Sequence, residues 1–445
     1  MKIGIIGTGY VGLVTGICFA SLGHKVYFYD KDKLKLNNLK KKNIYIYEKN
    51  LNKIYNKYQK NIHINDDLYE CLSNSEVCMI CVGTPQLNGK IDLRYIKEIS
   101  TDIGEKLNKI KKKIVICIKS TVLPGTCENF VKKFLNLKLR KKNNYFLVSN
   151  PEFLAEGSAV EDFLKPDRII IGADQHYAKN KMLSLYSNFN CKKILTNTNS
   201  AEMMKYTSNF FFSNLISFSN QIANICEKSK NVDAIEVMNS LYYDKRISIK
   251  KSNQILFPKL ISFLYPGCGF GGSCFPKDLK ALQRFSRDNN SQSDLIDSVL
   301  KINSSRALII FKKIKKILNK IKNKKILILG LAFKPDTNDT RYSPSLKIID
   351  LLLKNGAYIY AHDPIVKPED IIEKKFINNS KFKIINGNLT SFLKNNKDIN
   401  LVALCTIWKQ YKKIDKILYN KIPFFDARRF IDKTNIKKYY GIGIQ

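Results

Sequence analysis

Residues 2–30 of the 445-residue chain read KIGIIGTGYVGLVTGICFASLGHKVYFYD. The apolar run KIGII is typical of a buried β-strand, and the glycine turn GTGYVG follows it directly. The next segment, LVTGICFASLG, has the apolar spacing of a helix that ends at Gly23, and KVYFYD is a second strand-like run. A strand, a helix and a second strand in this order predict a βαβ unit, and therefore a parallel sheet.

The glycine turn has the spacing G-x-G-x-x-G at Gly7, Gly9 and Gly12. The first glycine permits the tight bend, the second lets a pyrophosphate approach the backbone, and the third lets the helix pack closely on the strand. Asp30 ends the second strand, where a carboxylate accepts hydrogen bonds from a ribose diol and repels a 2′-phosphate. The pattern predicts a dinucleotide site that takes NAD in preference to NADP, and a tight turn without a ligand is the alternative.

Three further strand-like runs, SEVCMICVGTP, KKIVICIKST and NYFLVSNPE, extend this first unit. Residues 200–230 contain no glycine or proline and have apolar side chains at helical spacing, which predicts one long helix of about 45 Å. We expect this helix to connect two domains or to form a dimer interface. Helical patterning continues to about residue 300 and is interrupted by the glycine-rich segment 265–276.

A second α/β unit begins near residue 325 with the strand KKILILG, the helix PSLKIIDLLLKNG and the strand AYIYAHDP. Asp363 ends that strand as Asp30 ends the earlier one, but no G-x-G-x-x-G accompanies it, so we expect a ligand other than a dinucleotide. The predicted fold class is α/β, with two Rossmann-like doubly wound domains joined by a long central helix and a helical middle domain. The expected domains are residues 1–195, 196–310 and 311–445.

The formal net charge is +38 at pH 7, which suggests nucleic acid or an anionic membrane as a partner. The lysines are spread along the whole chain, however, and are enriched together with Asn, Ile and Tyr, which favours compositional drift. We therefore expect no nucleic-acid partner and no membrane partner. The chain has no run of 18 apolar residues, and we expect no signal peptide, which favours a cytoplasmic location.

The 11 cysteines show no repeated spacing, which fits a reduced compartment. Cys78 and Cys81 form a C-x-x-C inside the apolar run VCMICVG. A zinc site would need a second pair of ligands, and the chain has only 4 His. We therefore expect two buried thiols in a strand, and no metal site.

The segment YPGCGFGGSCFPKDLKAL, residues 265–282, carries the clearest sign of chemistry. Pro276 suits the first turn of a helix, which places Cys274 at a helix N-terminus, whose positive end favours a thiolate. Lys277 is expected to add to this effect, and Asp278 shares a helix face with Cys274. From the spacing alone Cys274 is a candidate nucleophile, and a buried cysteine beside a glycine turn is the alternative.

Two polar groups of residues accompany this segment. Glu202, Lys205 and Asn209 align on one face of the long helix, where they line a site or face water; water is the simpler expectation. The segment SNPEFLAEGSAVEDFLKPDRIIIG, residues 149–172, holds four clustered carboxylates that act as acid, base or sugar ligands, or lie exposed as helix caps.

Together these segments resemble the UDP-glucose/GDP-mannose dehydrogenase family. The resemblance spans nearly the whole chain, because GTGYVG, VGTP, STVLPGT, SNPEFLAEGSA, KPDRIIIG, the Lys205 helix, PGCGFGGSCFPKD, GLAFKPDTNDTRYSP and HDP occur in the family's order with similar spacing. One position departs from the pattern, since Cys268 stands where family members often carry proline. Cys268 lacks the F-P-K-D helix start that follows Cys274, so Cys274 remains the expected nucleophile.

The resemblance implies an N-terminal NAD domain, a central dimerisation helix and a C-terminal UDP-sugar domain in a homodimer or higher homo-oligomer. It implies the four-electron oxidation of UDP-glucose to UDP-glucuronate, with GDP-mannose or a UDP-N-acetylhexosamine as alternative substrates. In this family the matching cysteine captures the aldehyde as a thiohemiacetal, which is oxidised to a thioester and hydrolysed. Covalent capture keeps the aldehyde from escaping between the two oxidations.

The resemblance also implies roles for other residues. Lys205 is expected to stabilise oxyanionic intermediates, Asn209 to hold the sugar or a water, and Glu152 to assist thioester hydrolysis. Asp278 and Thr121 are expected to position or activate water. The implied NAD contacts are Gly7, Gly9, Tyr10, Val11, Gly12, Asp30, Thr84, Thr121, Glu156 and Lys277. The implied UDP-sugar contacts are Glu152, Phe153, Leu154, Lys205, Asn209, Arg246 from the partner of a dimer, Phe263, Tyr265, Gly271, Lys334, and Arg341 as a phosphate fork.

Overall fold

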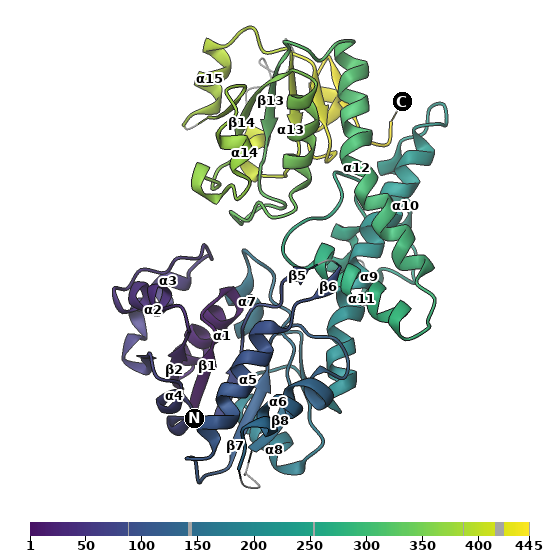
Figure 1. The fold of residues 1–445 in the computed structure, drawn as a ribbon. Coiled ribbons are helices and arrows are strands. Elements are labelled where there is room, and N and C mark those ends of the chain that lie inside the picture. Colours follow the sequence, from purple (N-terminus) through teal and green to yellow (C-terminus); the bar gives the residue numbers. More distant parts are fainter. Residues whose placement is uncertain (88, 141–144, 252–253, 386, 414–421, 445) are drawn as a thin grey trace. The chain divides into compact units, whose positions relative to one another are not determined.

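The computed structural model describes residues 1–445 apart from 88, 141–144, 252–253, 386, 414–421 and 445. The chain divides into two compact units, Met1–Ser208 and Asn209–Gln445, which are described one at a time (Figure 1). The three-domain division expected from the sequence, with boundaries near 195 and 310, stays a prediction.

Unit 1 is built on an eight-stranded sheet in the order β10-β9-β8-β7-β4-β1-β2-β3. The strands are β1 (Lys2–Ile6), β2 (Lys25–Tyr29), β3 (Ile62–Asn65), β4 (Val77–Ile80), β7 (Ile114–Ile118), β8 (Tyr145–Ser149), β9 (Arg168–Gly172) and β10 (Lys192–Thr196). Neighbouring strands are parallel except β8 and β9, which pair antiparallel. The strand order reverses between β1 and β4, as in a doubly wound Rossmann sheet, so the predicted fold class is confirmed.

Helices cover both faces of this sheet. They are α1 (Tyr10–Ser21), α2 (Lys33–Lys40), α3 (Leu51–Lys57), α4 (Leu68–Asn74), α5 (Arg94–Leu107), α6 (Lys132–Leu137), α7 (Ala159–Leu164) and α8 (His176–Leu185), with the short helices η1 (Gln59–Asn61) and η2 (Thr126–Val131). Residues of α1, α3, α7 and α8 enclose one apolar core, and residues of α4, α5 and α6 enclose another. The strands β5 (Gln86–Leu87) and β6 (Lys90–Ile91) form a small antiparallel pair.

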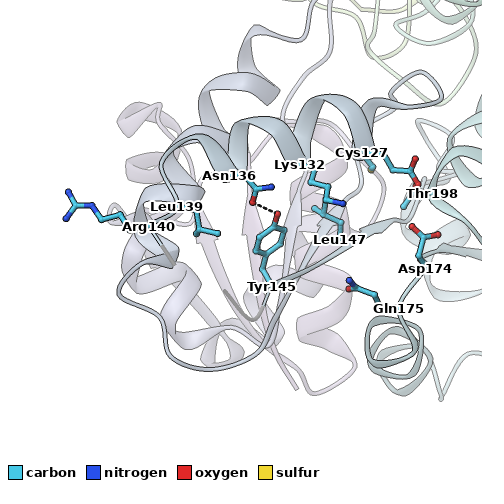
Figure 2. Close-up of a pocket in the computed structure, with 11 residues that line it drawn as sticks. Cys127, Lys132, Asn136, Leu139, Arg140, Tyr145, Leu147, Asp174, Gln175 and Thr198 are labelled. Atoms are coloured by element: carbon cyan, nitrogen blue, oxygen red, sulfur yellow. Dashed lines mark hydrogen bonds between the residues drawn. The ribbon is translucent and has the colours of Figure 1, made fainter. Parts of the chain in front are cut away.

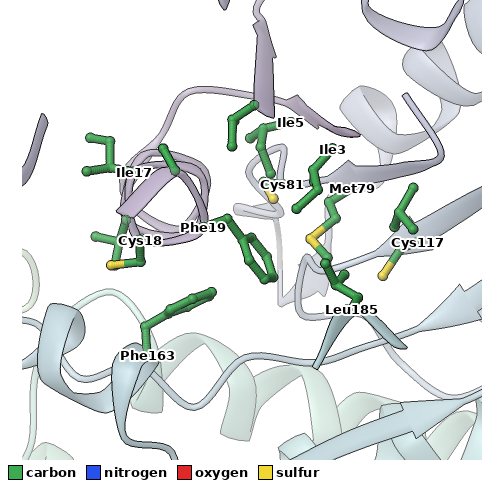
Figure 3. Packing of buried hydrophobic residues seen from close by; sticks show 14 of the residues in the cluster. Ile3, Ile5, Ile17, Cys18, Phe19, Met79, Cys81, Cys117, Phe163 and Leu185 are labelled. Atoms are coloured by element: carbon green, nitrogen blue, oxygen red, sulfur yellow. The ribbon is translucent and has the colours of Figure 1, made fainter. Parts of the chain in front are cut away.

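The two cores enclose the thiols of the C-x-x-C pair. Cys78 and Cys81 are both buried, one in each core, which confirms the expected pair of buried thiols. Burial raises the pKa of both groups. Figure 3 shows Cys81 within the first core, where the ring of Phe19 meets that of Phe163 edge to face at 4.9 Å between centroids.

The expected long helix is present as α9 (Thr198–Cys226), which ends short of residue 230. It leads into the helical part of unit 2, which contains α10 (Ala234–Tyr242), α11 (Phe275–Asp288) and α12 (Asp294–Leu318). The helical pattern expected up to residue 300 is wrong in one place, since β11 (Ile249–Lys251) and β12 (Gln254–Leu256) pair antiparallel. Every residue of these strands is exposed, so no buried face stabilises a helix there, and the β-branched isoleucines favour strands.

The rest of unit 2 contains a second parallel sheet, in the order β15-β14-β13-β16-β17-β18. Its strands are β13 (Lys325–Leu329), β14 (Tyr358–His362), β15 (Phe382–Ile384), β16 (Leu401–Leu404), β17 (Phe424–Asp426) and β18 (Tyr439–Gly441). The remaining helices and turns are η3 (Lys259–Phe263), α13 (Pro344–Lys354), η4 (Pro368–Asp370), α14 (Lys374–Ile377), α15 (Leu389–Asn395), η5 (Lys409–Lys413) and η6 (Lys433–Asn435). This order is again doubly wound, with its reversal between β13 and β16.

The carboxylate that directly follows β14 stabilises the turn after β13. The Oδ2 atom of Asp363 accepts hydrogen bonds from Leu331 N at 2.8 Å, Ala332 N at 3.1 Å and Trp408 Nε1 at 3.2 Å. Buried backbone N–H groups need such partners, so this carboxylate holds the turn in place.

Across the described ranges of both units, no helix combines the length and the apolar composition that crossing a bilayer requires.

Candidate active site

The glycine turn between β1 and α1 has room for a ligand. Gly7 adopts a φ of +94°, which glycine tolerates, and its N–H donates to Tyr29 O at 2.8 Å. A Cβ on Gly12 would lie 1.9 Å from Gly7 O, whereas a Cβ on Gly9 would meet no atom within 4 Å. No side chain caps the start of α1, so its first N–H groups are left for a ligand. This geometry fits a pyrophosphate at Gly9.

Asp30 is held at the end of β2 beside this turn. Its Oδ2 atom accepts hydrogen bonds from Thr8 N at 2.7 Å and from Thr8 Oγ1 at 2.8 Å, and its Oδ1 atom accepts from Asp32 N at 2.9 Å. Tyr45 braces the same turn by donating its hydroxyl to Thr8 O at 2.5 Å. The carboxylate is therefore fixed where the sequence predicts the contact with the ribose.

Glu48 is a buried carboxylate that the sequence analysis missed. Its Oε2 atom accepts hydrogen bonds from Gly157 N at 2.7 Å and from the Tyr10 hydroxyl, so it ties the first residue of α1 to the loop that contains Glu156. Burial, together with this carboxylate, raises the pKa of the Tyr10 phenol. No motif marks Glu48, because it lies in the irregular segment between α2 and α3.

The loops that follow β4 and β7 bring two predicted NAD contacts together. Thr84 donates its hydroxyl to Thr121 O at 2.9 Å, and Ser120 donates to Val82 O at 2.6 Å. The strands β4 and β7 are adjacent and parallel, so their carboxyl ends meet at one edge of the sheet. Ligand sites in open α/β sheets lie at such edges.

Lys205 and Glu152 form a buried ion pair in unit 1. The Lys205 Nζ atom lies 3.1 Å from Glu152 Oε1, and both side chains are less than 8% exposed. The second carboxylate oxygen accepts a hydrogen bond from Leu154 N at 2.6 Å, and Lys205 Nζ lies 5.2 Å from the centre of the Phe153 ring. Four of the predicted substrate contacts thus gather between α9 and the loop after β8.

Lys119 is a second buried cation of unit 1, and it too was missed. Its Nζ atom donates to Asn150 Oδ1 at 2.9 Å, and the Tyr186 hydroxyl donates to the same oxygen at 2.6 Å. Burial lowers the pKa of Lys119, and the positive charge of Lys205 acts in the same direction. The available signal was a lysine directly after the buried strand β7 in KKIVICIKST.

The polar stripe of α9 does not face water, so that expectation is wrong. Glu202, Lys205 and Asn209 are 2%, 4% and 6% exposed. Glu202 is tolerated in the interior because backbone N–H groups donate hydrogen bonds to its carboxylate. Glu202 Oε2 accepts from Gly125 N at 2.8 Å, and Oε1 accepts from Cys127 N at 2.9 Å. These N–H groups belong to the start of η2, where helical donors have no partner within the helix.

A second carboxylate makes the reciprocal contact. Glu128, in the first turn of η2, accepts hydrogen bonds from Thr198 Oγ1 at 3.0 Å and from Asn199 Nδ2 at 3.2 Å. Two glutamates on opposite helices therefore clamp the start of α9 to the turn that follows the STVLPGT loop. The clamp fixes the loop that contains Thr121 relative to the first turns of α9.

Glu202 should make the stability of the protein depend on pH. Burial raises the pKa of its carboxyl to about 7 from the ordinary 4.5, although the N–H donors oppose this shift. Between these values the folded protein holds a proton that the unfolded chain releases, so stability falls as the pH rises. We expect the contribution of Glu202 to the free energy of unfolding to fall by up to about 3 kcal/mol over this range.

Urea unfolding of the wild type and of Glu202→Gln at pH 5 and pH 8 checks this expectation. Glutamine does not titrate, so the stability of the wild type relative to the variant should decline from pH 5 to pH 8. Equal pH dependence of the two proteins would show that Glu202 does not titrate in this range.

A cavity of about 640 Å³ is lined in part by Glu128 and Thr198 of this clamp. It is lined by Cys127, Glu128, Lys132, Asn136, Leu139, Arg140, Tyr145, Leu147, Asp174, Gln175 and Thr198. Figure 2 shows the Tyr145 hydroxyl bonded to Asn136, at 2.7 Å, inside this cavity. None of the residues predicted to bind NAD or substrate is among the lining residues, so the cavity is separate from the predicted site.

In unit 2, Cys274 is the residue that precedes α11, and Pro276 lies in the first turn, as predicted. The Cys274 side chain is exposed. Asp278, one helical turn further on, is 1% exposed. Its Oδ2 atom accepts a hydrogen bond from Asn209 Nδ2 at 2.6 Å, and its Oδ1 atom pairs with Lys277 Nζ at 2.5 Å. The structure therefore brings Asn209, Lys277 and Asp278 together at the start of α11.

The competing thiol of the glycine segment is buried. Cys268 is 3% exposed, and its Sγ atom lies 3.6 Å from Cys405 O and 3.8 Å from Ala427 O. A reagent or substrate in solution reaches Cys274 and not Cys268. Exposure therefore favours Cys274 as the reacting thiol.

The loop after β13 packs against the glycine segment. Gly272 N donates to Arg341 O at 2.9 Å. A Cβ on Gly271 would lie 3.1 Å from Phe333 Cβ, and a Cβ on Gly272 would lie 2.7 Å from the ring of the same residue. Lys334 Nζ lies 5.7 Å from the centre of that ring. The predicted substrate contacts Gly271, Lys334 and Arg341 are thus near one another within unit 2.

Several predicted substrate contacts of unit 2 have side chains that interact with close neighbours. Arg341 directs its guanidinium at Asp339, with Nε and Nη2 each 2.8 Å from a carboxylate oxygen. Arg246 is exposed and binds Asp244 in the same way. The ring of Phe263 stacks on that of Phe212 at 4.5 Å between centroids. The ring centroids of Tyr265 and Tyr242 are 6.0 Å apart.

The chain matches three domains of the UDP-glucose/GDP-mannose dehydrogenase family: the NAD binding domain over residues 1–190, the central domain over 199–305 and the UDP binding domain over 327–433. It is 40% identical to UDP-glucose 6-dehydrogenase TuaD of Bacillus subtilis over 371 residues, which are 83% of this chain and 77% of that protein. It is 34% identical to UDP-glucose 6-dehydrogenase of Rickettsia bellii over 461 residues, which cover 100% of this chain and 99% of that protein. Among solved structures, a UDP-glucose dehydrogenase from the hyperthermophilic archaeon Pyrobaculum islandicum matches with a TM-score of 0.90 and 30% identity, over 100% of this chain and 98% of that chain.

Proposed function

Because the chain belongs to the UDP-glucose/GDP-mannose dehydrogenase family, we propose that it oxidises UDP-glucose to UDP-glucuronate with two molecules of NAD, through Cys274. The observation that carries the proposal is the start of α11, where the exposed Cys274 lies one helical turn before the buried Asp278 and its partner Asn209. The names of the similar proteins support UDP-glucose as the substrate.

Unit 1 has the residues to hold NAD, which supplies the hydride acceptor when it is bound. The open position at Gly9 and the uncapped start of α1 suit the pyrophosphate. Asp30 is fixed at the end of β2 to accept hydrogen bonds from a ribose. Thr84 and Thr121 line the adjacent strand ends.

Cys274 retains the sugar between the two oxidations. The C6 alcohol first loses a hydride and a proton and becomes an aldehyde. The Sγ atom of Cys274 then bonds to the aldehyde carbon and the oxygen takes a proton, which gives a thiohemiacetal. Loss of a second hydride and of that proton gives a thioester. Water adds to the thioester, the C–S bond breaks, and the carboxylate leaves with the thiol restored.

The resemblance to the family assigns tasks to the predicted polar side chains of each unit. Lys205 stabilises the negative charge that develops on the substrate oxygen, because a cation in a buried site acts strongly on such charge. Its partner Glu152 assists the hydrolysis of the thioester. Asp278 and Asn209 orient the attacking water in unit 2.

The loop after β13 receives the diphosphate of the substrate. Arg341 has the planar fork that binds phosphate with two hydrogen bonds, and it exchanges Asp339 for the ligand. Lys334, beside the Phe333 ring, adds a second positive charge. The match of residues 327–433 to a UDP binding domain supports this assignment.

We also propose a homodimer that forms along α9. Phe211, Phe218 and Ile225 are 49%, 43% and 54% exposed. Their spacing of seven residues places them on one stripe of the helix, and an exposed apolar stripe marks an interaction surface. Sedimentation velocity measures the oligomer directly. The cytoplasmic location expected from the sequence stays a prediction that cell fractionation tests.

The stoichiometry of the reaction tests the proposed function. Purified protein with limiting UDP-glucose and excess NAD should give two NADH per sugar, followed by absorbance, with UDP-glucuronate as the product. One NADH per sugar with accumulation of free aldehyde would contradict the thioester route. A panel of UDP-glucose, GDP-mannose and UDP-N-acetylhexosamines, ranked by kcat/KM, identifies the substrate.

A further inference from the structure

The glycine segment that ends at Cys274 is buried along most of its length. Residues 266–272 are buried, Ser273 is half-buried and Cys274 is exposed. Irregular backbone inside a protein leaves N–H and C=O groups without regular partners, and such groups must be satisfied by other means. For Gly267 and Phe270 these partners are side chains of two helices, α9 and α12.

Asn303 of α12 satisfies both backbone groups of Phe270. Its Oδ1 atom accepts from Phe270 N at 2.8 Å, and its Nδ2 atom donates to Phe270 O at 3.1 Å. The contact requires a glycine next to it, since a Cβ on Gly269 would lie 2.3 Å from Asn303 Oδ1. Gly269 also has a φ of +93°, which an L side chain rarely adopts.

Two more side chains satisfy both backbone groups of Gly267. Asn220 of α9 accepts from Gly267 N at 2.8 Å, and Arg306 of α12 donates its Nε–H to Gly267 O at 2.9 Å. Arg306 also donates from Nη1 to Asn224 Oδ1 at 2.7 Å. The segment is therefore held at Gly267 and Phe270 by polar side chains.

Holding a loop with a buried guanidinium lowers the stability of the protein. Arg306 is 0% exposed, and burial lowers its pKa. In the described part of the chain its Nη2 atom has no hydrogen-bond partner. Burying a charged group with an unpaired donor costs stability, and an apolar side chain would fill the same space at lower cost. An arginine at this position therefore indicates that the position of the glycine segment has a role beyond the packing of α9 and α12.

We propose that Asn303, Asn220 and Arg306 are positioning residues, which fix the glycine segment and thereby the place and reactivity of the Cys274 thiol. The proposal rests on the proposed function, in which Cys274 is the nucleophile. These residues act through the backbone of Gly267 and Phe270, and none of them is a predicted contact of substrate or NAD. A reacting sulfur displaced by about 1 Å costs up to about a hundredfold in rate.

The test compares Asn303→Asp and Asn220→Ala with the matched control Ser304→Ala, an exposed residue of α12. Asn303→Asp keeps the acceptor for Phe270 N but loses the donor to Phe270 O. Asn220→Ala removes the acceptor for Gly267 N. The readouts are kcat, the KM for NAD, the thermal midpoint, and the rate at which iodoacetamide alkylates Cys274 between pH 6 and pH 9, followed by mass spectrometry.

We expect both variants to lower kcat by about ten- to a hundredfold and to change the alkylation profile of Cys274. The KM for NAD should stay near the wild-type value, because most of the predicted NAD contacts lie in unit 1. Folded variants with wild-type kcat and alkylation would overturn the proposal. Failure of both variants to fold would also overturn it, because the network would then be structural alone.

Alkylation needs no turnover, so it separates the two proposals. A wild-type protein that oxidises no nucleotide sugar contradicts the proposed function. The alkylation profiles of the wild type and the variants still decide in that case whether Asn303 and Asn220 position Cys274.

Discussion

Replacing Cys274 by serine should lower kcat for the formation of UDP-glucuronate by about a thousandfold or more. A serine hydroxyl stays protonated near neutral pH and is a weak nucleophile without an adjacent base, whereas a thiol supplies thiolate. The positive end of α11 favours the charged thiolate, whereas a hydroxyl near neutral pH has no charged form for it to stabilise. The variant should release at most one NADH per sugar, measured by absorbance, with no acid detected by chromatography.

The matched control is Cys268→Ala in the same glycine segment. Cys268 is 3% exposed and belongs to the core of unit 2, so its loss should lower stability and leave turnover close to the wild type. Normal acid formation by Cys274→Ser would remove Cys274 from the mechanism. Loss of turnover in Cys268→Ala at a temperature where it is folded would return the buried thiol to consideration.

The fold follows from signals that are local in the chain. KIGII, the glycine turn and the helix up to Gly23 are each short and periodic, and the structure has them as β1, the turn and α1. Gly7 and Gly12 could be assigned from the sequence because their roles depend on neighbours within a few residues. The pair β11 and β12 was missed because its exposed residues give neither a helical nor a strand-like apolar period.

The site was harder to predict from the sequence than the fold, because its contacts join segments that are distant in the chain. Glu48 meets Gly157, and Lys119 meets Asn150, in each case without a motif that marks the partner. Asn303 is an ordinary polar residue of a helix until Phe270 is folded against it. Spacing within one element cannot reveal a partner on another.

The polar stripe of α9 was predicted only in part, for the same reason. The helical spacing placed Glu202, Lys205 and Asn209 on one face correctly, but it could not show what covers that face. Each residue is buried by a partner far away in the sequence: Gly125 for the first, Glu152 for the second and Asp278 for the third. Only the resemblance to a known family gave these residues a role before the structure did.

Replacing Lys205 by methionine should lower kcat by about a hundred- to a thousandfold, because the variant keeps an unbranched side chain one atom shorter and loses the charge that stabilises the oxyanion. It also leaves Glu152 buried without its cation, 3.1 Å away in the wild type, which should destabilise the protein by about 3–5 kcal/mol. Initial rates with UDP-glucose and urea unfolding measure the two effects. Lys228→Met, an exposed lysine just beyond α9, is the matched control for the loss of one charge.

The double variant Lys205→Met with Glu152→Gln separates catalysis from stability. Removing both charges abolishes the unpaired carboxylate, so most of the lost stability should return, while kcat should stay low because the cation is still absent and Glu152 no longer assists hydrolysis. Lys205→Arg keeps a cation and should retain more activity than the methionine variant, although its wider fork fits a site built for one ammonium group less well. Recovery of turnover in the double variant would mean that Lys205 serves to balance the charge of Glu152, and that another group stabilises the oxyanion.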